Sequence, residues 1–433
     1  MQESLFIRGL SGEKKLRGEI SVNTAKNAVL KAMTASVLFE DEVTLIDVPN
    51  IEDVHRMAEL LNNLGVEVKE EGRSLSITTK PDISTNLNTE ISERLRTSIV
   101  LVGPLLSRFG NVSFPHPGGC VIGARPIDFF LEGFEKFGAE ITHDNDRYEI
   151  KAKGGKLKGA DIFFKSQTHT GTETMMMTAV LADGKTTLKN CATEPEIKDL
   201  ADFLNLCGAN ITGAGTSTIE IEGGDLLRTN GKEHRVIPDR IETGSFLILG
   251  ALCADELTIN NCNPAHVEVL IEILRRSGVS IQTEVDKIII KNNGAIKNKS
   301  FTSTDVKTHE YPGFPTDLQA PMVVYLTQVT GESLVHETIF EGRLNYTTDL
   351  ARMGADITMW DAHRVEIKGP TPLTGRTLGS PDLRAGLAFV IAASVAKGNS
   401  LINNVYYIDR GYEHIETRLA KLGLDITRTN RTE

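Results

Sequence analysis

Two kinds of helical pattern alternate along the chain. In the first kind, apolar residues surround the whole helix, as in residues 246–252 (FLILGAL). A helix without a polar face is buried on all sides. We expect six such helices, at residues 25–39, 95–106, 172–181, 241–253, 318–327 and 383–396. A short strand is expected after each of them, at residues 42–46, 111–114, 186–189, 256–259, 333–336 and 400–403.

The second kind is an amphipathic helix that ends at a glycine and is followed by a strand. Six glycines stand at equivalent places, about seventy residues apart: Gly65, Gly138, Gly208, Gly278, Gly354 and Gly423. We expect each glycine to end its helix in the left-handed conformation, which glycine adopts without a steric cost. The chain is therefore interpreted as six copies of one unit. The copies indicate an α/β fold with two domains of three copies each, in which the helices lie inside and the sheets outside.

Composition narrows the class of protein. The chain has 433 residues, of which 40% are hydrophobic and 24% charged, and this is typical of a globular protein. Its start does not resemble a signal peptide, and no apolar run is long enough to span a bilayer, so we expect a cytoplasmic protein without a membrane partner. The net charge of −11 argues against general binding to nucleic acid. The pattern gives no indication of the oligomeric state.

Positive charges gather where the buried helices begin. Four of the six starts carry a lysine or arginine, among them Lys26, Arg240 and Arg384. A cation there opposes the helix dipole, whereas Asp, Thr and Pro at such places act as caps. An anion bound between the cations and the helix N–H groups would remove the conflict, although a salt bridge between domains explains each single residue equally well. Because Arg343 and Arg410 add further charge in later loops, we expect phosphorylated or carboxylated ligands.

A glycine-rich segment, residues 117–126 (PGGCVIGARP), holds Cys120. Glycines on both sides permit movement, and a thiol near the Arg125 cation can exchange a proton near neutral pH. The alternative is a surface turn with an incidental cysteine. The other cysteines are interpreted as packing residues: Cys191, Cys207, Cys253 and Cys262. The sequence contains neither a phosphate-binding glycine motif nor His and Cys residues at zinc-ligand spacing, so no metal and no organic cofactor are expected.

Taken together, these segments resemble the enolpyruvyl transferase superfamily, and within it the branch of peptidoglycan synthesis. The resemblance covers essentially the whole chain and rests on residues 25–28 (AKNA), 117–126, 194–197 (EPEI), 238–244 (PDRIETG), 314–317 (FPTD), 382–384 (DLR) and 408–413 (IDRGYE). The shikimate branch lacks the cysteine segment. The resemblance implies two inside-out α/β domains: residues 1–25 with 238–433 would form the catalytic domain, and residues 26–237 would carry the Cys120 segment and the nucleotide-binding loops.

The resemblance also implies a reaction. The enolpyruvyl group of phosphoenolpyruvate would be transferred to the 3′-hydroxyl of UDP-N-acetylglucosamine with release of phosphate, as the first committed step of peptidoglycan synthesis. Asp317 would take the proton of the attacking hydroxyl. Cys120 would act in proton transfer or product release, and the inhibitor fosfomycin alkylates this position in the family. These two substrates are the partners that the resemblance implies.

Residue roles follow from the same resemblance. Lys26, Arg125 and Arg410 would bind the phosphate of phosphoenolpyruvate, and Arg343 and Arg384 would lie near its carboxylate. The full set of implied catalytic residues is Cys120, Asp317, Lys26, Arg410 and Asp382. The implied substrate-binding residues are Asn27, Arg96, Arg125, Pro126, Ile127, Asp128, Phe129, Thr168, His169, Thr170, Asp239, Arg240, Ile339, Arg343 and Arg384.

Three segments depart from the family pattern. Asn23-Thr24 stands where the family usually has Ser-Gly, and Phe129-Phe130 is more apolar than is usual near the uracil. Residues 168–172 read THTGT where the family usually has SVGAT. His169 would therefore either add a cation to the diphosphate site or face solvent in a loop.

Because the departures concern nucleotide recognition, two alternative functions stay open. The chain would be a paralogue that uses another nucleotide or sugar acceptor, or an inactive relative that binds a nucleotide sugar and regulates. The retention of Lys26, Cys120, Asp317, Arg384 and Arg410 argues against the inactive relative.

Overall fold

The computed structural model describes residues 3–118, 126–144, 147–292 and 301–430. These residues form two compact units: residues 3–23 and 238–430 are unit 1, and residues 24–118 and 126–237 are unit 2. Within unit 1 the amide of Asp239 donates to the carbonyl of Asn23 (2.9 Å), and within unit 2 the amide of Ala25 donates to the carbonyl of Ile237 (2.8 Å). The chain passes from one unit to the other twice, near residues 23–25 and near residues 237–239. In each unit the two passing segments are hydrogen-bonded to each other.

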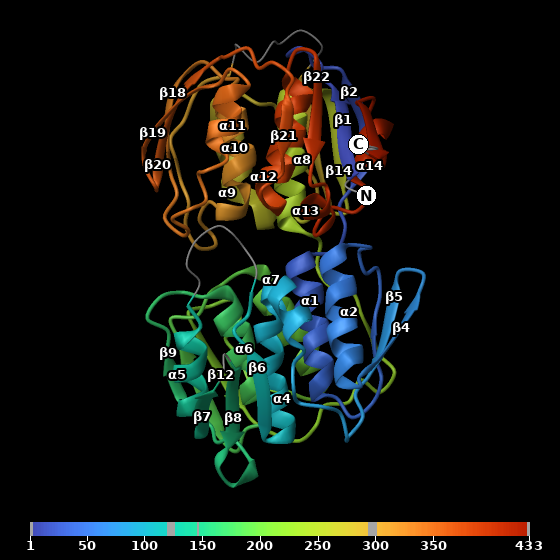
Figure 1. The fold of residues 1–433 in the computed structure, drawn as a ribbon, viewed down its shortest axis with the longest axis vertical. Coiled ribbons are helices and arrows are strands. Elements are labelled where there is room, and N and C mark those ends of the chain that lie inside the picture. The colour runs from blue at the N-terminus through green and yellow to red at the C-terminus, as the bar shows by residue number, and fades with distance from the viewer. Residues whose placement is uncertain (1–2, 119–125, 145–146, 293–300, 431–433) are drawn as a thin grey trace. The chain divides into compact units, whose positions relative to one another are not determined.

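The predicted buried helices are all present (Figure 1). In unit 1 they are α8 (Arg240–Cys253), α10 (Gln319–Leu326) with the preceding 3₁₀ helix η6 (Thr316–Leu318), and α12 (Leu383–Val395). In unit 2 they are α1 (Lys26–Ala35) with η1 (Ser36–Leu38), η2 (Arg96–Leu101) with α4 (Val102–Phe109), and α6 (His169–Ala179). Every residue of α8, α10 and α12 is buried, and these three helices pack against one another. The expectation of helices without a polar face is confirmed.

Amphipathic helices ending at glycines are also confirmed. They are α2 (Glu52–Leu64), α5 (Asp128–Lys136), α7 (Pro195–Leu206), α9 (Glu268–Ser277), α11 (Thr347–Arg352) and α14 (Ile415–Lys421). All six predicted glycines have φ between 86° and 110°, in the left-handed region. Each one ends its helix and turns the chain into the next strand.

Each unit holds three sheets among its described residues. In unit 1 their orders are β21-β22-β1-β23, β15-β16-β14-β2 and β17-β18-β20-β19. The strands are β1 (Glu3–Arg8), β2 (Leu16–Ser21), β14 (Ala254–Asn260), β15 (Ile281–Thr283), β16 (Lys287–Lys291), β17 (Val306–Lys307), β18 (Gly331–His336), β19 (Asp356–Asp361), β20 (Arg364–Gly369), β21 (Thr377–Gly379), β22 (Asn399–Asn403) and β23 (Asp425–Asn430). In Figure 1, sheet strands such as β18, β19 and β20 lie outside the helices of their unit.

Unit 2 has the sheet orders β13-β3-β5-β4, β6-β8-β7 and β11-β12-β10-β9. The strands are β3 (Val43–Leu45), β4 (Glu67–Glu71), β5 (Ser74–Thr78), β6 (Asn111–Pro115), β7 (Ala139–Asp144), β8 (Arg147–Ala152), β9 (Asp161–Phe163), β10 (Lys185–Lys189), β11 (Asn210–Thr212), β12 (Thr218–Glu222) and β13 (Glu233–His234). Each unit has its own hydrophobic core.

Strands from the two ends of each unit's sequence pair with each other. In unit 1, β1 lies antiparallel between β22 and β23, so that Leu5 is opposite both Ile402 and Arg428. In unit 2, the late strand β13 pairs in parallel with the early strand β3. The three repeats of each unit therefore close on themselves, as expected for a pseudo-symmetric domain.

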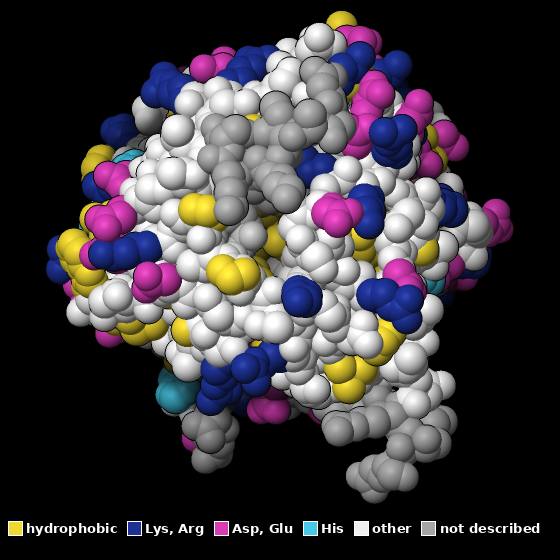
Figure 2. All heavy atoms as spheres, turned by 90° about the horizontal axis from the view of Figure 1, so that it is seen from above, with side chains coloured by type: hydrophobic (Ala, Val, Ile, Leu, Met, Phe, Trp, Pro, Cys, Tyr) yellow, Lys and Arg dark blue, Asp and Glu magenta, His cyan; other side chains and the backbone are white. Residues whose placement is uncertain are grey.

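On the face seen in Figure 2, basic and acidic side chains are interspersed. No helix among the described residues has the length and apolar character needed to cross a membrane.

Candidate active site

A carboxylate shared by two arginines is the central feature of unit 1. Asp317 lies in η6, Arg384 is the second residue of α12, and Arg343 lies in the turn region that follows β18. Oδ1 of Asp317 is 2.7 Å from Nη2 of Arg343. Oδ2 of Asp317 is 3.0 Å from Nε and 2.8 Å from Nη2 of Arg384. Three predicted site residues, far apart in sequence, therefore meet.

Burial differs between the members of this cluster. The side chains of Arg343 and Arg384 are only 5% and 7% exposed, whereas that of Asp317 is 26% exposed. Burial by itself would lower the pKa of Arg384, but the negative charge of Asp317 outweighs it, and the pKa lies above its usual value. The arginine is thus a fixed positive charge with a reachable carboxylate beside it.

Each of the two guanidiniums also donates a hydrogen bond to a hydroxyl group. Nη1 of Arg343 donates to Oγ1 of Thr316 at 2.9 Å, and Nη1 of Arg384 donates to the Tyr412 hydroxyl at 3.1 Å. The Tyr412 hydroxyl in turn lies 3.2 Å from Oγ of Ser245. Burial raises the pKa of Tyr412, so its hydroxyl keeps its proton.

Glu337 lies behind Arg343 and is fully buried. Its Oε2 accepts a hydrogen bond from Oγ1 of Thr316 at 2.7 Å. Its Oε1 accepts from the hydroxyl of Thr308 (3.1 Å) and from the amides of Ile339 (2.8 Å) and Phe340 (3.2 Å). This carboxylate therefore fixes the turn that leads to Arg343.

Two predicted site residues cap helices. Asp239 accepts hydrogen bonds from the amides of Ile241 (2.8 Å) and Glu242 (3.0 Å) at the start of α8. Asp382 accepts from the amides of Arg384 (2.8 Å) and Ala385 (3.1 Å) at the start of α12. These bonds satisfy N–H groups that a helix start leaves without partners.

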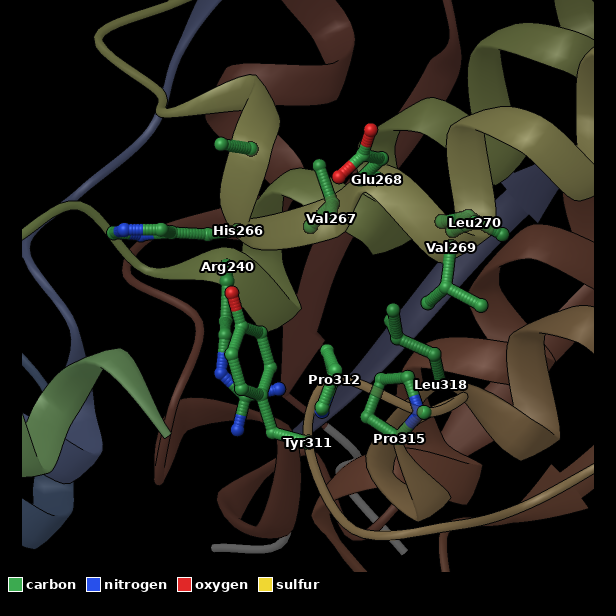
Figure 3. A pocket seen from close by; sticks show the side chains of 12 residues that line it. Arg240, His266, Val267, Glu268, Val269, Leu270, Tyr311, Pro312, Pro315 and Leu318 are labelled. Atoms are coloured by element: carbon green, nitrogen blue, oxygen red, sulfur yellow. The ribbon is translucent and has the colours of Figure 1, made fainter. Parts of the chain in front are cut away.

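Arg240 lines a pocket of about 230 Å³ in unit 1 (Figure 3). Its guanidinium lies over the ring of Tyr311, 5.7 Å from the ring centre. The other walls are formed by residues 265–270, which span the end of the 3₁₀ helix η4 (Pro264–Val267) and the start of α9, and by residues 311–318. The lining thus combines the Arg240 cation, the Glu268 carboxylate and the His266 ring with otherwise mostly apolar walls.

The other predicted residues of unit 1 are Ile339 and Arg410. Ile339 is half-buried, and its amide donates to Glu337 as described. Arg410 follows α13 (Tyr406–Asp409) and is also half-buried.

In unit 2, Lys26 begins α1 beside a buried carboxylate. Its Nζ is 3.3 Å from Oδ2 of Asp53, which is 3% exposed. The neighbouring Asn27 accepts a hydrogen bond from Nζ of Lys31 through its carbonyl (3.0 Å). At the start of η2, Nη1 of Arg96 donates to the carbonyl of Pro117 at 2.7 Å. Lys26 and Arg384 thus each have a carboxylate partner within their own unit.

His169 belongs to a buried charge cluster. It is the first residue of α6, and its Nε2 is 3.2 Å from Oε1 of Glu173. Oε2 of Glu173 is 2.9 Å from Nζ of Lys31, and both of these side chains are buried. Burial by itself would lower the pKa of His169, but Glu173 and then Glu194 outweigh it and raise the pKa. His169 therefore does not lie in a solvent-facing loop.

Two predicted nucleotide segments meet beside this cluster. A Cβ atom added to Gly171 would lie 2.5 Å from Cγ2 of Thr168 and 2.6 Å from Cε2 of Phe129. The first turn of α6 therefore packs directly against the first turn of α5. Residues 126–129 and 168–170 are brought together, with Ile127 buried and Pro126 and Asp128 exposed. The side chain of Thr168 caps α6 by accepting from the amide of Gly171.

Cys120 and Arg125 lie outside the described residues. The four other cysteines are buried and free, as predicted for packing residues. Burial raises the pKa of Cys191 and of Cys253 to about 12. Within the described ranges, no group of three His, Cys, Asp or Glu side chains is placed to hold a metal ion.

Several residues of this arrangement were missed by the sequence reasoning. Glu337, Lys31 and Glu173 were not singled out, although the last two are charged residues inside helices that are otherwise apolar. That mismatch is a readable signal, because a charge in such a helix needs a buried partner. Glu337 carries a weaker signal, a carboxylate directly after a strand and shortly before an arginine.

Comparison with known proteins gives a consistent result. The model of the EPSP synthase (3-phosphoshikimate 1-carboxyvinyltransferase) family matches residues 10–419. The chain is 44% identical over 423 residues to a UDP-N-acetylglucosamine 1-carboxyvinyltransferase of Koribacter versatilis (strain Ellin345), covering 97% of this chain and 95% of the relative. It is 42% identical over 419 residues to the enzyme of that name from Desulforapulum autotrophicum, covering 97% and 98%.

Solved structures agree on the fold. The enolpyruvyl transferase NikO from Streptomyces tendae matches with a TM-score of 0.85 at 20% identity and covers 100% of both chains. EPSP synthase from Acinetobacter baumannii matches with a TM-score of 0.73 at 17% identity, covering 99% of this chain and 100% of the other. The expected enolpyruvyl transferase fold is confirmed. The chain belongs to the EPSP synthase family and, within it, to the UDP-N-acetylglucosamine 1-carboxyvinyltransferases.

Proposed function

We propose that this protein transfers the enolpyruvyl group of phosphoenolpyruvate to the 3′-hydroxyl of UDP-N-acetylglucosamine and releases inorganic phosphate, as the first committed step of peptidoglycan synthesis. The observation that carries the proposal is the nearly full-length identity of 42–44% to relatives named for this activity. Both substrates are phosphorylated metabolites, which supports a place of action in the cytoplasm.

Arg343 and Arg384 bind the carboxylate of phosphoenolpyruvate in this proposal. Their guanidiniums are buried, and each is fixed by a carboxylate and a hydroxyl before any substrate arrives. Cations that are already oriented stabilise developing negative charge without a cost of reorganisation during the reaction. Asp317 is the more exposed member of the cluster and takes the proton of the attacking hydroxyl.

The phosphate is bound by Lys26, Arg125 and Arg410. The contact with Asp53 supports this role for Lys26, because it holds the ammonium group at the start of α1. Cys120 assists proton transfer or product release, and Asp382 contributes to the reaction through the oxygen that does not cap α12.

The acceptor nucleotide contacts residues 126–129 and 168–170, which meet at the starts of α5 and α6. The remaining substrate contacts come from Asn27, Arg96, Asp239, Arg240 and Ile339. We assign the acceptor side of the reaction to these residues.

The test is phosphate release from phosphoenolpyruvate, measured with and without UDP-N-acetylglucosamine, for the wild type and for Cys120→Ser. We expect release that depends on the sugar nucleotide and that fosfomycin abolishes in the wild type. Release only with another nucleotide or sugar would instead identify a paralogue with a different acceptor. Binding of UDP-N-acetylglucosamine without any release would identify an inactive regulatory protein.

A further inference from the structure

Arg343 has two partners of different kinds. One is Asp317, whose side chain is 26% exposed and therefore reachable by a substrate. The other is the Thr316 hydroxyl, which accepts from Arg343 and donates a hydrogen bond to the fully buried carboxylate of Glu337. The connection from Arg343 through Thr316 to Glu337 thus ends in a carboxylate that is shielded from solvent. The contact between Arg343 and Asp317, by contrast, can be broken when a substrate reaches Asp317.

The two oxygens of Asp317 contact different arginines. Oδ2 makes two contacts with Arg384, at 3.0 and 2.8 Å, while Oδ1 has one contact of 2.7 Å with Arg343. A proton acceptor must turn a lone pair toward its substrate, and when Oδ1 does so it gives up its contact with Arg343. The partner that loses its carboxylate contact during proton transfer is therefore Arg343.

We propose that Thr316 and Glu337 form a positioning pair that keeps Arg343 in place when Asp317 turns to the substrate. The inference rests on the function proposed above, because it assigns the pair to the arginine that binds the carboxylate of phosphoenolpyruvate. Neither residue touches the reacting atoms in this proposal. Both act through Arg343.

The charges support this arrangement. The negative charges of Asp317 and Asp239 both act on Arg384, whereas Arg343 contacts Asp317 directly and is connected to Glu337 through Thr316. When Asp317 turns to the substrate, the hydrogen-bonded connection from Arg343 through Thr316 to the carboxylate of Glu337 remains. A buried cation that kept no anionic or hydrogen-bonded partner would be strongly disfavoured.

Glu337 also shapes the chain on the other side of Arg343. Its Oε1 accepts from the amides of Ile339 and Phe340, and the Arg343 guanidinium lies 5.3 Å from the centre of the Phe340 ring. The Glu337 carboxylate therefore orients both the Thr316 hydroxyl and the segment that carries the Phe340 ring, and both of these contact the Arg343 guanidinium.

The test compares Thr316→Val with Thr316→Ser. Valine matches threonine in shape but removes the hydroxyl, whereas serine keeps it. We expect Thr316→Val to raise the KM for phosphoenolpyruvate about tenfold, with a smaller effect on kcat and an unchanged KM for UDP-N-acetylglucosamine, because a hydrogen bond to a charged group is lost. Thr316→Ser is expected to stay within about threefold of the wild type.

Glu337→Gln is a second variant, with Tyr325→Phe as its control. Tyr325 lies in α10 and bonds to Ser277, so its substitution removes a buried hydroxyl without touching the arginines. We expect Glu337→Gln, and not Tyr325→Phe, to raise the KM for phosphoenolpyruvate. Thermal unfolding of all four variants shows whether each one folds.

Two results would overturn the inference. One is equal kinetics for Thr316→Val and Thr316→Ser, and the other is a wild-type KM for phosphoenolpyruvate in folded Glu337→Gln. A wild type that released no phosphate with any acceptor would instead refute the proposed function, so the two failures are distinguishable.

Discussion

Among single residues, Tyr412 binds Arg384 in the same way as Thr316 binds Arg343: each hydroxyl accepts a hydrogen bond from Nη1 of its arginine. Its hydroxyl accepts from Nη1 of Arg384 and lies against Ser245, and the whole side chain is 1% exposed. Besides Asp317, the buried carboxylate of Asp239 acts on Arg384 through its charge. The Tyr412 phenol adds an uncharged hydrogen-bond partner that helps to hold the Arg384 guanidinium in place.

We expect Tyr412→Phe to raise the KM for phosphoenolpyruvate about tenfold, because the guanidinium loses a hydrogen bond and gains freedom to turn. Steady-state kinetics with varied phosphoenolpyruvate measure this. Tyr325→Phe is the matched control, since it also removes a buried tyrosine hydroxyl. Identical effects of the two substitutions would contradict the assignment.

His169 gives the protein a pH-dependent contribution to stability. Its pKa is raised in the folded state above the ordinary value of 6.5. The contribution is therefore fully present below that value and is lost as the pH rises through the raised pKa. The pKa of Glu173 is lowered: burial opposes this shift, and the charges of His169 and Lys31 outweigh burial. Its own contribution is lost only in acid, as the pH falls through that lowered pKa.

We expect His169→Gln to be less stable than the wild type near neutral pH, with a difference that shrinks toward alkaline pH. Urea unfolding of both proteins over a pH series measures the difference. The groups that face the imidazole are Glu173 from its own helix, Lys31 from α1 and Glu194 at the start of α7. A difference that grew with pH would contradict the protonated imidazole.

Side-chain contacts between residues far apart in the sequence could not be predicted from the sequence. Asp317, Arg343 and Arg384 were each identified as site residues, but the sharing of one carboxylate by two arginines depends on side-chain rotamers and on three separate turns. Glu337 was missed because its importance comes from the amides and hydroxyls that it meets in space. The roles of Cys120 and Arg125 stay predictions.

Among elements, the six buried helices were predictable to within about three residues at each end. Residues 241–253 were expected as a helix, and α8 spans Arg240–Cys253. The reason is physical: a helix that is apolar all round has one stable environment, and the glycine that ends each amphipathic helix has few alternatives to the left-handed region. Loops lack such constraints, and the site is built largely from loops and helix starts.

Asp382 combines a structural and a proposed chemical role at the start of α12. We expect Asp382→Ala to lower the free energy of unfolding by about 1 kcal/mol, because the capping bonds to Arg384 and Ala385 are lost. Asparagine caps as well as aspartate does, so Asp382→Asn is expected to keep the stability while losing activity about tenfold or more.

Chemical denaturation and phosphate release are measured on both Asp382 variants. Asp239→Asn is the comparison for α8, since Asp239 caps that helix in the same way. Full activity of Asp382→Asn would show that capping is the whole role of this residue.

At the scale of the whole molecule, the closure of unit 1 depends on its first strand. Ile7 in β1 is fully buried and stands opposite Ser400 and Ile426. We expect Ile7→Asp to destabilise unit 1 by about 4 kcal/mol or more, because a charge without a partner enters the core. Hydrogen exchange should then become fast in the strands of unit 1 while those of unit 2 keep their protection. Equal loss of protection in both units would contradict separate cores.

The position of β1 also sets an order of events on the ribosome. Its neighbours β22 and β23 are the last strands among the described residues, so β1 waits for both partners until almost all of these residues have been synthesised. Unit 2, whose described residues end at 237, has all of its strands long before that. Unit 2 therefore has all the strands of its described sheets while β1 still lacks both of its neighbours.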